Sequence, residues 1–79
     1  MAGGSSMTLD LADIGRKYEV TDLKIEGTTG RRLEALGLTQ GTKIELMNLK
    51  GNGAVIFKVR GTRLAVGKQI AHAIVVKEA

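Results

Sequence analysis

The chain lacks most of the side chains on which enzymes and metal sites depend. It has no cysteine, so neither a disulfide nor a thiolate metal site can form. It has a single histidine, His72, with no cysteine or carboxylate cluster near it in the sequence, whereas most metal sites need about three or four donors. No apolar run reaches transmembrane length and no signal peptide is visible. We therefore expect a cytoplasmic protein that is not an enzyme and holds no cofactor or metal ion.

Aromatic side chains are also scarce, since Tyr18 and Phe57 are the only two in the chain. Small β-barrels that bind RNA or DNA usually stack bases on exposed aromatic side chains. The strand pattern described below buries Phe57, and Tyr18 alone cannot form such a platform. Specific recognition of nucleic acid is therefore not expected, although non-specific contact with phosphates stays open as an alternative.

Basic residues are concentrated in the second half of this chain of 79 residues, whose net charge is +4. Residues 1–34 carry five basic and six acidic side chains, whereas residues 35–79 carry seven basic and two acidic ones. A basic half can bind nucleic acid, anionic lipid or an acidic protein surface, or it can be a solvated face. The length suits one small domain, which we place at residues 7–79, after an added or linker-like leader at residues 1–6.

Alternating apolar and polar residues indicate a mainly β protein with one or two short helices. A break in the alternation at Thr21-Asp22 predicts a bulge in the first strand. One helix is expected to be capped by Thr28 or Thr29 and to stop at Gly37, where Leu38 can contact Leu33. Short strands in this order favour a small closed SH3-like β-barrel with a helical insertion. The expected strands cover about residues 18–25, 43–49, 54–60, 63–66 and 73–76, and a second helical turn covers residues 67–72.

Gly61-Thr62 is predicted to be a two-residue hairpin loop, with Arg60 facing Arg63. This register separates an apolar face from a charged face. The apolar face contains Phe57, Val59, Leu64 and Val66. The charged face contains Lys58, Arg60, Arg63 and Ala65.

Pairing the strand at residues 43–49 with the next strand sends four apolar side chains outward. They are Met47, Leu49, Ala54 and Ile56. Either the N-terminal segment around Leu9, Leu11 and Ile14 covers this patch or the patch is open to a partner, and we favour partial cover by that segment.

Two placements of cations work against folding. Arg31 and Arg32 are expected in the first turn of the helix, where the helix dipole disfavours positive charge. Arg60 and Arg63 are expected to form a like-charge pair across the hairpin. Conflicts of this kind tend to gather at functional surfaces, which makes these arginines candidates for partner binding.

Three segments resemble the FeoA family of small ferrous iron transport proteins. Residues 32–46 contain the pattern Leu-Gly-Leu-x-x-Gly-x-x-Ile, which is similar to the central motif of that family. Residues 59–66 and 71–76 resemble its closing strands, and the likeness spans about residues 9–77. Gln40 departs from the family, which often has proline at that position. The same domain type also occurs at the C-terminal end of iron-dependent repressors.

The resemblance implies an SH3-like barrel in the cytoplasm that regulates FeoB, the membrane permease that imports ferrous iron. The leading hypothesis is therefore a non-enzymatic accessory protein that binds the cytoplasmic part of a FeoB-like permease. The alternatives are a small nucleic-acid-binding β-barrel and a metal-sensing SH3-like module with transition-metal binding, and the oligomeric state stays open. The candidate partner-binding residues are Arg31, Arg32, Leu36, Met47, Ile56, Arg60 and Arg63.

Overall fold

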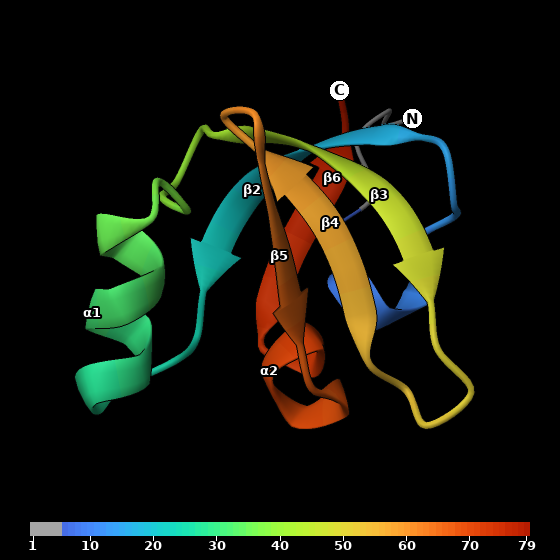
Figure 1. Ribbon diagram of the computed structural model, residues 1–79. Helices are drawn as coiled ribbons and strands as arrows, with labels where there is room; N and C mark the ends of the chain where they lie inside the picture. The colour runs from blue at the N-terminus through green and yellow to red at the C-terminus, as the bar shows by residue number, and fades with distance from the viewer. Residues whose placement is uncertain (1–5) are drawn as a thin grey trace.

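Six antiparallel strands and two short α-helices make up the computed structural model, which describes residues 6–79 (Figure 1). The predicted leader at residues 1–6 lies outside the described residues except for Ser6. The elements are β1 (Met7–Thr8), a 3-10 helix η1 (Leu9–Leu11), β2 (Lys17–Leu23), α1 (Gly27–Ala35), β3 (Lys43–Leu49), β4 (Val55–Val59), β5 (Thr62–Val66), α2 (Lys68–His72) and β6 (Ile74–Glu78).

The strands form one sheet in the order β1-β6-β2-β3-β4-β5. The sheet curls around its core, and α1 is inserted between β2 and β3 and stands beside the barrel (Figure 1). This arrangement confirms the predicted mainly β, SH3-like barrel with a helical insertion. The barrel is not closed as expected, because β1 and β5 end the sheet without pairing with each other.

The core is built from alternate residues of the strands, because successive side chains of a strand point to opposite faces. Phe57 is fully buried at the centre of β4, as the sequence predicted. Leu9 of η1 and Ala71 of α2 are buried with the strand residues in the same cluster. No helix within residues 6–79 is long and apolar enough to span a membrane.

Helix α1 begins earlier than predicted. Its N-cap is Glu26, which makes no side-chain capping bond, so capping by Thr28 or Thr29 is wrong. Arg31 and Arg32 consequently lie beyond the first turn, and Arg32 falls in the last turn, where the helix dipole favours a cation. The predicted conflict between these two arginines and the dipole is therefore wrong.

The end of α1 confirms the prediction. Gly37 has a φ of 101°, a conformation that glycine adopts without steric cost. The Leu38 N–H donates to the Leu33 carbonyl at 3.0 Å, and the Gly37 N–H donates to the Glu34 carbonyl at 3.0 Å. These two bonds define a Schellman ending.

The β4–β5 hairpin turns one residue earlier than predicted. Arg60 and Gly61 form the loop, with φ values of 51° and 81°, as a type I′ turn requires. Lys58 therefore faces Arg63, and the predicted pairing of Arg60 with Arg63 is wrong. The two faces were nevertheless assigned correctly. Each β4 residue pairs with a β5 residue two positions earlier than predicted, and a shift of two positions keeps every side chain on the same face.

The first strand bends where the sequence predicted, with a register shift between Val20 and Asp22. A second shift lies in β3, between Leu46 and Asn48. The predicted cover for the outward apolar patch is wrong. Leu9 enters the core instead, while Leu11 and Ile14 remain 69% and 55% exposed.

Candidate partner-binding surface

A row of charged side chains crosses the outer face of the sheet from β2 to β5. Lys17, Glu45, Lys58 and Arg63 lie directly opposite one another on successive strands. Neighbouring strands are about 4.8 Å apart, so the row spans about 14 Å. We call these four residues the charged row. Three of its members are cations, and its two residues nearest the β5 edge are both positive.

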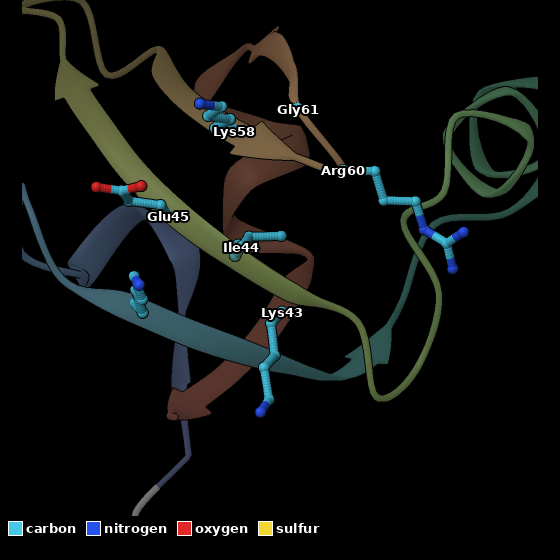
Figure 2. A pocket seen from close by; sticks show the side chains of 7 residues that line it. Lys43, Ile44, Glu45, Lys58, Arg60 and Gly61 are labelled. Atoms are coloured by element: carbon cyan, nitrogen blue, oxygen red, sulfur yellow. The ribbon is translucent and has the colours of Figure 1, made fainter.

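A shallow hollow of about 290 Å³ lies over this face, where β2, β3 and the β4–β5 hairpin meet (Figure 2). Glu45 is its only acidic lining residue. Water reaches the hollow, so its cations are available to an anionic group of a partner. The lining residues are Lys17, Lys43, Ile44, Glu45, Lys58, Arg60 and Gly61.

Arg60 connects the hairpin turn with the end of α1. A Cβ atom on Gly37 would lie 2.8 Å from the Arg60 Cδ, so the arginine side chain packs directly against this glycine. Figure 2 shows the side chain of Arg60 extending away from Lys58, towards the helix. Leu36, the neighbour of Gly37, is 43% exposed. The fold therefore places Arg60 against Gly37, the residue that follows the exposed Leu36, although Arg60 is distant from both in the sequence.

The other candidate residues divide into two places. Arg31 and Arg32 are exposed on α1, and Arg32 shares a helix face with Leu36 through their i, i+4 spacing. Met47 and Ile56 are half-buried on β3 and β4. The sequence candidates thus lie in two places. Those on α1 and at the hairpin turn form one group, and Met47, Ile56 and Arg63 lie on the outer face of the sheet.

Sequence reasoning named none of the lysines of this surface as a partner-binding candidate, although it placed Lys58 on the charged face of the hairpin. Lys17, Lys43 and Lys58 come from three different strands, and only the strand pairing places them beside Arg60. The observed hairpin register adds that Lys58 lies directly opposite Arg63. For Lys17 and Lys43, strand positions predicted without strand pairing do not indicate that they lie on this surface.

Neither aromatic side chain is available to a ligand. Tyr18 and Phe57 are 1% and 0% exposed. The Tyr18 hydroxyl accepts a hydrogen bond from the Asp13 N–H at 2.8 Å. No base could therefore stack on an aromatic ring of this protein.

His72 has a carboxylate neighbour that its sequence position concealed. The His72 Nδ1 lies 3.2 Å from the Asp10 Oδ2, which joins α2 to η1. Thr8 Oγ1 and Asp10 Oδ1 are buried beside this pair and find no hydrogen-bond partner among residues 6–79, which leaves the hydroxyl free to turn towards the carboxylate. Anywhere within residues 6–79, no three His, Cys, Asp or Glu side chains gather into a group that could hold a metal ion.

The pKa of Asp10 lies below its ordinary value. Burial acts to raise this pKa, but the Thr8 hydroxyl, the His72 side chain and the Asp10 backbone amide together lower it by stabilising the carboxylate. A carboxylate with a lowered pKa stabilises the fold above its unfolded pKa, and this contribution disappears as pH falls through the folded pKa.

We expect Asp10→Asn to destabilise the protein slightly at neutral pH, by about 0.5 kcal/mol, because the exposed His72 is screened by water. The difference from the parent protein should shrink below about pH 4. Urea unfolding at pH 7 and pH 3.5 measures it, with Asp13→Asn, at a side chain that is 75% exposed, as the control. A difference that does not change with pH would contradict this assignment.

Comparison with known proteins places the chain in a family. The model of the FeoA domain matches residues 7–78. A crystal structure of an iron uptake regulatory protein (FeoA) has a TM-score of 0.82 and 27% identity, over 95% of this chain and 99% of that chain. The solution structure of the FeoA protein from Chlorobium tepidum has a TM-score of 0.84 and 29% identity, over 91% of this chain and 70% of that chain.

A manganese-dependent transcriptional repressor is similar over 100% of this chain and 45% of its own, with a TM-score of 0.85. Its identity is 14%, so this likeness concerns the fold alone. No curated protein sequence matches the chain. The resemblance seen in the three sequence motifs is confirmed by the family match and by the two FeoA structures, and the chain belongs to the FeoA family.

Proposed function

We propose that this protein is a non-enzymatic accessory protein of ferrous iron uptake, which binds the cytoplasmic part of a FeoB-like permease. Membership of the FeoA family supports a role in ferrous iron transport. The proposal places the protein in the cytoplasm, where that part of the permease lies, and gives it a regulatory role without a reaction of its own.

One structural observation carries the choice of contact surface. Arg60 packs on Gly37, which follows the exposed Leu36 in the chain, so a cation and an exposed apolar residue are both present where the hairpin turn meets the end of α1. Arg31 and Arg32 extend this surface along the helix. An interface core of an apolar side chain with arginines around it is typical of protein–protein contacts, in which arginine is enriched.

We expect the double variant Arg31→Glu/Arg32→Glu to bind the cytoplasmic domain of the permease about tenfold more weakly, because it places negative charge where the partner meets positive charge. Calorimetric titration of the purified domain measures the affinity. The control variant Lys50→Glu/Lys68→Glu makes the same change in net charge at exposed positions outside α1 and the segment that leads into it. Equal affinities for the parent protein and the arginine variant would remove α1 from the interface.

Nucleic-acid binding is the second candidate, because the charged row and the hollow present several cations together. Binding to phosphates alone depends steeply on salt. Filter binding to RNA and duplex DNA over a salt series separates the two functions. Submicromolar binding that falls steeply with salt would favour nucleic acid, and the buried aromatic rings argue against it.

A further inference from the structure

The last strand of the sheet has an open edge. Within residues 6–79, β5 pairs only with β4 and ends the strand order. Arg63 and Ala65 are exposed and Leu64 is half-buried, so water reaches this edge. The other end of the sheet, β1, is two residues long and offers too short a template for another strand.

The hairpin turn determines which backbone groups of β5 are free. In a two-residue hairpin the residues flanking the loop, here Val59 and Thr62, form a hydrogen-bonded pair. Hydrogen-bonded and non-hydrogen-bonded pairs alternate along an antiparallel ladder. The N–H and C=O groups of Arg63 and Ala65 therefore point away from β4, towards the open edge.

The side chains around this edge select the chemistry of an added strand. Lys58 lies directly opposite Arg63, and Arg60 stands at the turn. Cations on an edge strand discourage pairing with an identical strand, since like charges would meet. An acidic strand meets the same cations favourably. Beyond them, Ala65 faces Ile56, which leaves an apolar place two residues along the edge.

We propose that β5 is the docking edge for an extended acidic segment of the protein partner, which adds to the sheet as a further strand. Such addition takes affinity from main-chain hydrogen bonds and specificity from alternate side chains. The best-fitting segment has an acidic residue beside Arg63 and an apolar residue two positions away, beside Ala65 and Ile56. This inference rests on the proposed function, which makes the partner a protein. It assigns that partner a second contact, separate from α1.

Amide hydrogen exchange followed by NMR on the whole isotope-labelled protein tests the proposal. In the free protein the Arg63 and Ala65 amides should exchange fast, while the Leu64 amide between them is protected by β4. Addition of the permease's cytoplasmic domain should slow exchange at Arg63 and Ala65 by about tenfold or more. The same pattern is expected with a synthetic eight-residue peptide in which glutamate and valine take turns at every second position, with threonine between them, because this spacing puts an acidic and an apolar side chain two positions apart on one face. It is not expected with the counterpart in which lysine replaces glutamate.

Charge reversal at the edge gives a second, independent measurement. We expect Arg63→Glu to weaken binding of the glutamate–valine peptide about tenfold, because it turns an attraction into a repulsion. Lys17→Glu is the matched control, since it makes the same charge change in the charged row but three strands away. Equal weakening by both variants would show a non-specific charge effect and would overturn the proposal.

The outcomes separate this inference from the proposed function. Binding of the permease domain with unchanged exchange at Arg63 and Ala65 would overturn the edge and leave the proposed function standing. Absence of permease binding together with protection by the acidic peptide would overturn the proposed partner and support the edge. If exchange at Arg63 and Ala65 slowed as the protein concentration rose, with no partner present, a second copy of the chain would occupy the β5 edge. That result would overturn the proposal that an acidic segment of a partner binds there.

Discussion

Replacing Phe57 with alanine is expected to leave about half of the protein unfolded at room temperature. Phe57 is fully buried at the centre of β4, and removal of a buried phenyl ring costs about 3–5 kcal/mol through lost burial and the cavity left behind. A single domain of this size has a total stability of roughly 3–5 kcal/mol. The expected cost is therefore as large as the whole free energy of unfolding. Circular dichroism and urea unfolding measure the loss.

The conservative variant keeps this prediction quantitative. Phe57→Leu fills much of the same space and should cost about 1 kcal/mol, so that it still unfolds cooperatively at a lower urea midpoint. Ile14→Ala, at a side chain that is 55% exposed, should leave the midpoint nearly unchanged. A folded Phe57→Ala protein with the parent midpoint would show that the ring does not carry the core.

Gly30→Ala is expected to displace α1, although alanine is the better helix former. Gly30 is buried, and a Cβ atom there would overlap the backbone carbonyl oxygen of Ile25. Backbone cannot turn away as a side chain can, so α1 or the Lys24–Glu26 segment must shift. Overpacking costs about 1–3 kcal/mol, against a propensity gain of about 1 kcal/mol. Because the overlap is with backbone, we take the upper end of that cost and expect the free energy of unfolding, measured in urea, to fall by about 2 kcal/mol.

Gly51→Ala is the matched control for this substitution. Nothing lies within 4 Å of a Cβ atom at Gly51, and its backbone is not left-handed. The same chemical change should there be neutral or stabilising by about 0.5 kcal/mol, because alanine restricts the unfolded chain. If both variants had equal stability, the close approach of α1 to Ile25 would not constrain the helix.

Gly30→Ala should also affect partner binding. Gly30 seats α1 on the segment that leads into it, and the proposed contact residues Arg31 and Arg32 follow directly in the chain. Gly30→Ala should therefore weaken binding of the permease domain even where the barrel stays folded. Its effect on the β5 edge should be small, since that edge depends on β4 and the hairpin turn.

The hairpin shows how far local patterns reach. Alternation along each strand was enough to assign both faces of the hairpin correctly, because side chains alternate with a period of two. The turn itself was placed one residue late. Sequence reasoning favoured glycine at the first loop position, whereas Arg60 adopts a left-handed φ of 51° and permits a type I′ turn. That one-residue difference replaces an arginine pair by the Lys58–Arg63 pair of the charged row.

The helix gives the complementary lesson. Its end was predictable because Gly37 and Leu38 form a Schellman ending with residues of the last turn, all within a few positions. Its beginning was not, because Thr28 and Thr29 are good capping residues that the chain does not use as caps. The tight contact with Ile25, which no propensity encodes, accompanies that earlier start.

Local patterns in the sequence were sufficient for the order of the elements from β2 to β6, the bulge in β2, most strand residues of the core and membership of the FeoA family, but not for β1, η1 or the burial of Leu9. Each of the predicted features depends on periodicity or on motifs within a short window. The surface features arose from pairing between distant segments: the Asp10–His72 contact, the packing of Arg60 on Gly37, the charged row and the open edge of β5. Hydrophobic burial is encoded residue by residue, whereas a binding surface depends on which strands become neighbours, and only the folded sheet specifies that.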